Sequence, residues 1–308
     1  MKTEINFSIV TPVYNREDCI LRCLNSITNQ NFQNVEHLIV NDGSTDGTLD
    51  ILETYSKSHP HVTILNLKKN RGVNAARNFA IKQCKNSYVI FLDSDDYMSN
   101  QALNIITEKI NLYPGYLHYL FTTDDMTVHY NSNLLLNCES KEIKFANWIK
   151  GEIAGDFLHV MSREMIQQFL FNENLRIYEA LNFMKMYRYS NKQRFVKTIV
   201  VHLERNRHDS VTKEATLINS NAIQSQCEYL KQMIDLFEDD YKKYNISGLY
   251  SMINRCLIFN LALSDYNSYK YLSKRFKKRV IFDKIICKLK LGYLIKLLIV
   301  AYSRIKNL

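Results

Sequence analysis

The ten-residue stretch from Ser87 to Asp96, SYVIFLDSDD, most strongly limits the folds that this chain can adopt. Its first half is a short, continuous β-prone run, typical of a strand that is buried on both faces of a parallel sheet. Three carboxylates, Asp93, Asp95 and Asp96, follow directly. At the carboxyl end of such a strand they would lie in the crevice where open α/β sheets bind ligands.

Three carboxylates within four residues repel one another unless a positive group joins them. A divalent cation with a bound phosphate would do so, because hard oxygen ligands select Mg²⁺ or Mn²⁺. Taken alone, the letters DSDD are more typical of a solvated acidic turn. Other parts of the sequence are needed to distinguish a metal site from a solvated turn.

The first half of the chain alternates strand-like and helix-like patterns. This alternation predicts βαβ units and a mostly parallel sheet flanked by helices. Right-handed crossovers would bring the carboxyl ends of the strands to one edge. Ser44 or Thr45 is expected to cap the second helix, and Ser99 or Asn100 the fourth. Strands are predicted over residues 7–14, 35–40, 62–67, 88–92 and 116–123, and helices over 16–30, 49–55, 72–84 and 101–112.

The predicted edge has the topology of a nucleotide site but lacks the usual phosphate loops. No GxGxxG motif follows the first strand, and no GxxxxGK[ST] motif occurs in the sequence. These absences argue against hydride transfer on NAD and against P-loop ATP hydrolysis. A diphosphate held through a metal by acidic residues fits the sequence better.

Four motifs carry a resemblance to a known family: TPVYNRE at 11–17, VNDGSTDGT at 40–48, NRGVNAARN at 70–78 and FLDSDD at 91–96. In this order and spacing they resemble family 2 glycosyltransferases of the GT-A fold, a Rossmann-like α/β fold. The resemblance covers residues 1–125. It implies an inverting transfer of a sugar from a nucleotide diphosphate, usually a UDP-sugar, with Mn²⁺ or Mg²⁺.

The resemblance also implies roles for individual residues. Asp42 is expected at the uracil edge and Asp93 at the ribose, while Asp95 is expected to ligate the metal with help from Asp96. Structural alternatives stay open, since Asp42 could only cap a turn and Arg77 could only pair with a surface acid. The residues expected to bind the nucleotide are Thr11, Pro12, Tyr14, Glu17, Asp42, Asn74, Arg77, Asp93 and Ser94.

Residues 171–190, FNENLRIYEALNFMKMYRYS, are similar to the place where related enzymes carry a Glu-Asp pair that opens a helix and supplies the general base. Here Glu179 is followed by Ala180. A direct displacement needs a base within hydrogen-bond reach of the acceptor hydroxyl. We therefore expect Glu179 to be the base, at a helix N-terminus where its charge is favoured. Asp156 is the alternative, and either acid could be purely structural.

A further strand is predicted over residues 195–203, and a basic loop follows it. Arg207 and His208 in this loop are candidates for contact with the diphosphate, and His208 also for the metal. The loop could equally be solvated. We expect a GT-A domain over residues 1–212, with a nucleotide-binding half (1–125) and an acceptor half (126–212), and a helical region over 213–308.

The helical region carries the positive charge of the chain. Residues 270–308 contain twelve Lys and Arg against one acid, Asp283, whereas the formal net charge of the whole chain is +9. Helices are predicted over 222–237, 249–263 and 284–302. The last of these is too short to span a bilayer, and Lys296 interrupts its apolar run. Together with the basic residues before it, this segment is typical of an amphipathic helix that lies on an anionic membrane. A helix that closes the core or a dimer face is the alternative, and no motif supports binding to nucleic acid.

Seven scattered cysteines without a CxxC motif indicate free thiols in a reducing cytosol. The first residues, MKTEINFSIV, do not resemble a signal peptide. Processive synthases of similar fold carry transmembrane helices and a QxxRW motif, and neither occurs here. We expect a non-processive transferase on the inner face of a bacterial plasma membrane, extending a lipid-linked O-antigen or capsule glycan. A non-catalytic nucleotide-sugar-binding or scaffold protein is the alternative that Ala180 keeps open.

Overall fold

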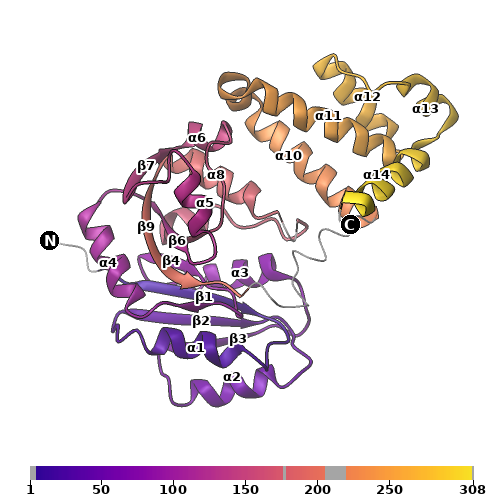
Figure 1. Ribbon diagram of the computed structural model, residues 1–308. Coiled ribbons are helices and arrows are strands. Elements are labelled where there is room, and N and C mark those ends of the chain that lie inside the picture. Colours follow the sequence, from indigo (N-terminus) through magenta and orange to yellow (C-terminus); the bar gives the residue numbers. More distant parts are fainter. Residues whose placement is uncertain (1–4, 176–177, 205–219, 307–308) are drawn as a thin grey trace. The chain divides into compact units, whose positions relative to one another are not determined.

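The computed structural model describes residues 5–175, 178–204 and 220–306 (Figure 1). The chain divides into two compact units, Met1–Asn206 and Arg207–Leu308, here called the N-terminal and the C-terminal unit. The predicted domain boundary after residue 212 lies outside the described residues and stays a prediction.

The N-terminal unit contains a nine-stranded mixed sheet in the order β3-β2-β1-β4-β8-β6-β9-β5, with β7 also paired to β9. Strands β1 to β4 run parallel, as predicted, but β8 is antiparallel to β4 and to β6. The α/β prediction is therefore confirmed, while the sheet is mostly parallel only in its first half. The strands are β1 (Phe7–Val13), β2 (Val35–Asn41), β3 (Val62–Asn66), β4 (Tyr88–Phe91), β5 (Tyr97–Met98), β6 (His118–Thr123), β7 (Ser140–Lys144), β8 (Phe157–Ser162) and β9 (Lys192–His202).

Helices cover both faces of this sheet. On β1, Phe7, Ile9 and Val13 pack into one hydrophobic cluster with α1, α2 and α4, while Val10 packs into another with α3, α7 and α8. This alternation explains why the strand is buried throughout, since each face meets helices. The helices are α1 (Ile20–Thr28), α2 (Thr48–Ser56), α3 (Val73–Ile81), α4 (Ala102–Leu112), α5 (Thr127–Ser132), α6 (Phe145–Ile149), α7 (Arg163–Gln168) and α8 (Ala180–Ser190).

The sheet brings the acidic residues to one edge. Because β8 is antiparallel to β4 and β6, its first residue lies where those strands end, and Phe157 pairs with Thr122. Asp156, which precedes β8, therefore lies at the same edge as the DSDD sequence that follows β4.

Several local predictions were wrong. Strands β5 and β7 and helix α5 were not predicted. Neither Ser44 nor Thr45 caps α2, since the side chain of Asp46 accepts the hydrogen bond from Thr48 N at 3.0 Å. Nor do Ser99 or Asn100 cap α4, whose N-cap is Gln101 without a side-chain cap.

The C-terminal unit has its own hydrophobic core. Predicted helix 284–302 is in fact two helices, which are separated at Lys290 by a left-handed backbone conformation (φ 52°). None of the helices in the described part of the chain is long and apolar enough to cross a membrane. The helices are α10 (Ser220–Tyr244), α11 (Ile246–Ala262), α12 (Tyr266–Phe276), α13 (Asp283–Leu289) and α14 (Gly292–Lys306), of which α12 was not predicted.

Candidate active site

The loop after β1 is fastened to the loop after β2. Asn15 N donates to Ser44 Oγ at 3.0 Å, and Asn15 Oδ1 accepts a hydrogen bond from Thr45 N at 2.8 Å. Glu17 Oε2 accepts a further bond from Gly47 N at 2.6 Å. Glu17 therefore has a structural role, whereas Tyr14, 38% exposed, presents its ring to solvent.

Asp42 fixes the loop that follows β3. Its Oδ1 accepts a hydrogen bond from Arg71 N at 2.8 Å and its Oδ2 accepts one from Gly72 N at 2.7 Å. The two loops are in close contact at Gly43 (φ +70°), where an added Cβ would lie 2.6 Å from the carbonyl carbon of Lys69. Asp42 is buried, and its expected contact with uracil stays a prediction.

Thr11 and Pro12 lie inside the core. Both are buried within β1, and Thr11 Oγ1 is 2.9 Å from Nε2 of His37. Burial, together with the nearby His61, lowers the pKa of His37 to about 3, so this ring is neutral. This burial supports a structural role for Thr11 and Pro12, and their expected contact with a nucleotide stays a prediction.

Arg77 joins two of the predicted functional acids. Its Nη2 donates to Asp93 Oδ1 at 2.8 Å and its Nη1 to Glu179 Oε1 at 3.1 Å. The guanidinium is buried beside the rings of Phe91 and Phe171. Burial acts to lower the pKa of Arg77, but the carboxylates of Asp93 and Glu179 outweigh it, and the pKa is raised. A permanent positive charge thus lies between the two acids.

Helix α3 holds the segment that carries Glu179. Asn74 Nδ2 donates to the carbonyl oxygens of Asn172 and Leu175 at 3.1 and 2.9 Å. Asn78 Nδ2 donates to Phe171 O at 2.9 Å, and its Oδ1 accepts a hydrogen bond from Phe171 N at 2.8 Å. Asn74, predicted to approach the donor, is therefore a buried residue that positions this segment. As predicted, Glu179 stands at the start of a helix, as the N-cap of α8.

The three acids of the DSDD sequence differ in their surroundings. The side chain of Asp93 is 51% exposed, and that of Asp95 is 23% exposed with Oδ2 4.0 Å from Arg16 Nη2. Asp96 Oδ1 accepts a hydrogen bond from Glu204 N at 2.9 Å. Ser94, between them, is buried.

Among the described residues, no three His, Cys, Asp or Glu side chains lie close enough together to hold a metal. Mg²⁺ is usually held by one or two carboxylates together with substrate phosphates, so the partly exposed Asp95 fits such an ion without a protein cage. Arg207 and His208, the predicted diphosphate contacts, lie outside the described residues.

The structure adds residues that sequence reasoning missed. Arg16, which lies within the TPVYNRE motif, was not predicted to be part of the site, although its Nη2 lies 4.0 Å from Asp95 Oδ2. Arg22 Nη2 donates to the carbonyl oxygen of Asp95 at 2.7 Å. The one sequence signal for Arg22 is its place in the predicted helix that follows the TPVYNRE motif.

An acid–histidine pair lies at the end of β9. His202 Nδ1 is 2.7 Å from Asp124 Oδ2, and His202 Nε2 is 3.1 Å from Ser99 Oγ. Burial acts to raise the pKa of Asp124, but hydrogen bonds from Leu203 N and His202 lower it. His202 is the last residue of β9, and a third of its side chain is exposed.

The alternative base, Asp156, is exposed. Its carbonyl oxygen accepts a hydrogen bond from the hydroxyl of Tyr130. Glu179, by contrast, shares the guanidinium of Arg77 with Asp93 of the donor motif. The geometry therefore favours Glu179 over Asp156.

The model of a known family, glycosyl transferase family 2, matches residues 8–170. The chain belongs to glycosyl transferase family 2. This confirms the resemblance carried by the four motifs, and the matched residues include Asp42, Asp93 and Asp95.

Relatives of this family 2 chain fall into two groups by coverage. A poly(ribitol-phosphate) beta-glucosyltransferase from Bacillus spizizenii is 45% identical over 102 residues, which are 32% of this chain and 16% of that protein. A GalNAc(5)-diNAcBac-PP-undecaprenol beta-1,3-glucosyltransferase from Campylobacter jejuni is 25% identical over 266 residues, 80% of this chain and 82% of that protein. The match to the Bacillus spizizenii protein thus spans less than a fifth of the length of that protein.

Solved structures show the same fold. TarS 1–349 from S. aureus in complex with UDP-GlcNAc has a TM-score of 0.59 at 21% identity, over 86% of this chain and 84% of that one. The mannosyltransferase PcManGT from Pyrobaculum calidifontis, in complex with GDP-Man and Mn²⁺, has a TM-score of 0.59 at 14% identity, over 98% and 88%. These likenesses confirm the predicted GT-A fold.

Proposed function

We propose that this family 2 chain is a non-processive inverting glycosyltransferase. It moves a sugar from a UDP-sugar to a hydroxyl of a growing, lipid-linked surface glycan of the O-antigen or capsule type. The observation that carries this proposal is the shared contact of Asp93 and Glu179 with Arg77. It brings an acid of the donor motif and the candidate base to one guanidinium at one edge of the sheet.

On the donor side, Asp93 is proposed to bind the ribose, and Tyr14 and Asp42 to flank the base. Asp95, assisted by Asp96, would hold Mn²⁺ or Mg²⁺. When bound, this ion supplies Lewis-acid stabilisation of the departing diphosphate. Arg207 and His208 stay proposed diphosphate contacts.

On the acceptor side, Glu179 is proposed to take the proton from the attacking hydroxyl. Its Oε1 is held by Arg77, so Oε2 is the oxygen that would receive this proton. The acceptor oxygen forms a bond to the anomeric carbon as the bond to the diphosphate breaks, and the configuration inverts. The side chain of Glu179 is 27% exposed, which allows an acceptor hydroxyl to reach it.

The substrates are proposed from the comparisons and from charge. A structural neighbour holds UDP-GlcNAc, which supports a UDP-sugar, and another holds GDP-Man with Mn²⁺, which supports the metal. The name of the Campylobacter relative contains an undecaprenol-linked acceptor, which supports a lipid-linked glycan. Residues 270–308, with twelve basic residues and one acid, suit the anionic inner face of a plasma membrane. We therefore propose a cytoplasmic, peripheral location.

One experiment separates this enzyme from the alternative, a nucleotide-sugar-binding or scaffold protein. A panel of UDP- and GDP-sugars is incubated with the full chain, Mn²⁺ and a lipid-linked glycan, and nucleotide release is measured. Acceptor-dependent release of UDP is expected. Tight binding of a donor without release would favour the scaffold, which Ala180 keeps open, and a preference for a GDP-sugar would contradict the role proposed for Asp42.

A further inference from the structure

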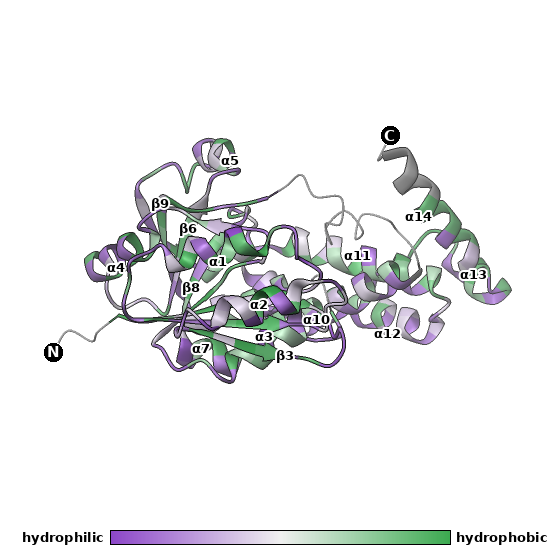
Figure 2. Cartoon of the chain, turned by 90° about the horizontal axis from the view of Figure 1, so that it is seen from below, coloured by the Kyte–Doolittle hydropathy of each residue, from purple (hydrophilic) through white to green (hydrophobic). Residues whose placement is uncertain are grey.

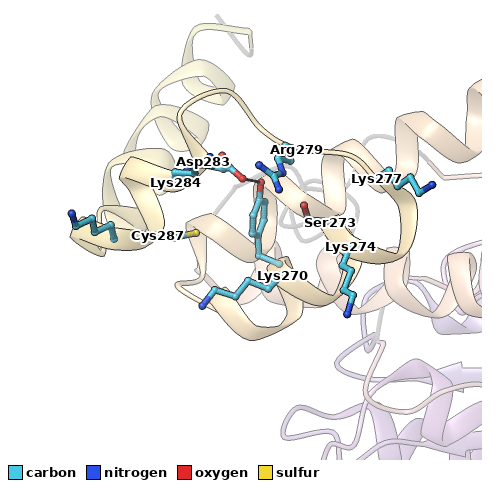
Figure 3. A pocket seen from close by; sticks show the side chains of 10 residues that line it. Lys270, Ser273, Lys274, Lys277, Arg279, Asp283, Lys284 and Cys287 are labelled. Carbon is cyan, nitrogen blue, oxygen red and sulfur yellow. Dashed lines mark hydrogen bonds between the residues drawn. The ribbon is translucent and has the colours of Figure 1, made fainter.

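The C-terminal unit contains a basic pocket between α12 and α13 (Figure 3). It is an open pocket of ≈ 930 Å³, and its walls come from α12, from the connection after α12 and from α13. Six of the ten side chains that line it are basic and one is acidic. The basic ones, here called the pocket cations, are Lys270, Lys274, Lys277, Arg279, Lys284 and Lys288.

The pocket cations lack counter-ions within the described part of the protein. Arg275, which is also on α12 but does not line the pocket, differs from them because it forms ion pairs with Asp235 and Glu238 of α10. No such ion pair involves any of the pocket cations among the described residues. A group of like charges without partners favours an external anion.

The single acid of the pocket is occupied by a structural contact. Asp283 Oδ2 accepts a hydrogen bond from the hydroxyl of Tyr269 at 2.9 Å, and the same hydroxyl accepts one from Val280 N at 3.1 Å. Tyr269 is buried, so this pair fixes the connection between α12 and α13 (Figure 3). Asp283 therefore shapes the wall of the pocket while its charge is outnumbered.

Exposed apolar side chains lie close in sequence to the residues that line the pocket. Ile281 and Phe282, two and three residues after Arg279, are 78% and 68% exposed, and no residue of α13 is buried. On α14, Leu297 and Leu298 are 60% and 69% exposed, and Figure 2 shows hydrophobic colouring along this helix. Cations beside exposed apolar residues match an anionic amphiphile, whereas nucleic acid would leave the apolar residues in water.

We propose that the basic pocket binds the phosphate head group of an anionic lipid. The exposed residues before α13, Ile281 and Phe282, and those of α14, Leu297 and Leu298, would enter the acyl boundary beside it. Lysines bind phosphate as point charges, and Ser273 in the lining can donate a further hydrogen bond. The inference rests on the proposed function, which places the protein at a membrane. It adds a defined binding site, which should bind a terminal phosphate more tightly than a surface of the same negative charge without one.

The test uses the full chain and flotation with vesicles. Phosphatidylcholine vesicles contain either phosphatidic acid, which has a terminal phosphate, or phosphatidylglycerol, adjusted to the same surface potential. The pocket variant is Lys274→Gln/Lys284→Gln. The control, Lys243→Gln/Lys278→Gln, removes the same charge from two lysines that do not line the pocket and lie over the rings of Tyr244 and Tyr250. Thermal unfolding of both variants verifies their fold.

Binding to phosphatidic acid is expected to exceed binding to phosphatidylglycerol. The pocket variant should lose about 25-fold in affinity, roughly fivefold for each lysine near an anionic surface, and the control less than about threefold. Equal losses in both variants, or equal binding to both lipids, would overturn the proposal in favour of diffuse charge. Inorganic pyrophosphate that binds as tightly as the vesicles would overturn the lipid as ligand, as would preferred binding of a single-stranded oligonucleotide. UDP binding by the pocket variant should be unchanged, so a failure here is distinguishable from a failure of the proposed transferase.

Discussion

Asp93 and Glu179, which lie far apart in the sequence, are hydrogen-bonded to the same guanidinium, that of Arg77, at 2.8 and 3.1 Å. The DSDD sequence ends a buried strand, whereas Glu179 begins a helix in the second half of the unit. Arg77 reaches both because α3 packs against the sheet and the segment before α8 is bound to α3 through Asn74. The proposed donor residue Asp93 and the proposed base Glu179 are thus positioned by one helix.

The first prediction concerns Arg77. Arg77→Met keeps the bulk of the side chain but removes both charge-assisted hydrogen bonds. We expect the free energy of unfolding to fall by about 1–3 kcal/mol, at the low end because Asp93 and Glu179 are partly exposed. Sugar transfer should fall by about 10²-fold, since the base is no longer held in place. Thermal unfolding and initial transfer rates measure the two effects.

A matched control for this prediction is Arg71→Met. Arg71 Nη2 donates to Glu173 at 2.8 Å, but both side chains are 40–49% exposed. Such a pair contributes at most about 1 kcal/mol. If Arg71→Met lowered stability and transfer as much as Arg77→Met, the special position of Arg77 would be disproved.

The second prediction separates the two candidate bases. Glu179→Gln removes the proton acceptor but keeps the shape of the side chain, so transfer should fall by about 10²- to 10⁴-fold while UDP affinity stays the same. Asp156→Asn should keep near-normal transfer. Steady-state rates and UDP titrations provide the measurement. Normal turnover by Glu179→Gln together with an inactive Asp156→Asn would reverse the assignment.

The third prediction concerns pH. His118 Nε2 is 2.9 Å from His159 Nδ1. Burial lowers the pKa of both rings. The pKa of His159 falls to about 3, and the nearby charge of Arg77 contributes to this shift. The pKa of His118 falls well below its ordinary value, and His159 contributes to that shift. The unfolded chain, with a histidine pKa of about 6.5, therefore binds more protons than the folded one. Stability is complete above that value and falls as the pH drops below it, by up to about 1.4 kcal/mol per pH unit for each ring.

Urea unfolding of the full chain at pH 7.5 and at pH 5.5 checks this slope. The double variant His118→Phe/His159→Phe places apolar rings in an aromatic environment that already includes Phe183 and Tyr187. We expect it to show a weaker dependence of unfolding on pH than the wild type. An unchanged pH dependence would mean that other groups cause the acid destabilisation.

The part of the fold that local patterns determine was predictable. Buried strands and amphipathic helices up to Thr123 follow from apolar runs and helical spacing, and the position of Glu179 at a helix start follows from its motif. The two-residue strand β5 carries too little pattern to be found, and it exists only because Tyr97 and Met98 pair with β9. At the break between α13 and α14 the left-handed residue is Lys290, a type that rarely adopts this conformation, while the nearby Gly292 already belongs to α14.

The site was predictable as a set of residues but not as a geometry. The motifs indicated Arg77, Asp93 and Glu179 separately, but their connection depends on how α3 lies against the sheet. Buried Thr11 has the sequence position of a ligand contact, yet its hydroxyl pairs with His37 in the core. Such differences arise from side-chain direction in the folded chain, which a single sequence does not specify.

The central claim is that the DSDD acids hold a nucleotide diphosphate through a metal. Isothermal titration of UDP into the full chain, with Mn²⁺ and then with EDTA, tests it most directly. We predict that Mn²⁺ strengthens UDP binding by about tenfold or more, equal to roughly 1.4 kcal/mol, and that Asp95→Asn removes this gain while Glu179→Gln retains it. UDP binding that is independent of Mn²⁺, or a full response to Mn²⁺ in Asp95→Asn, would contradict the account.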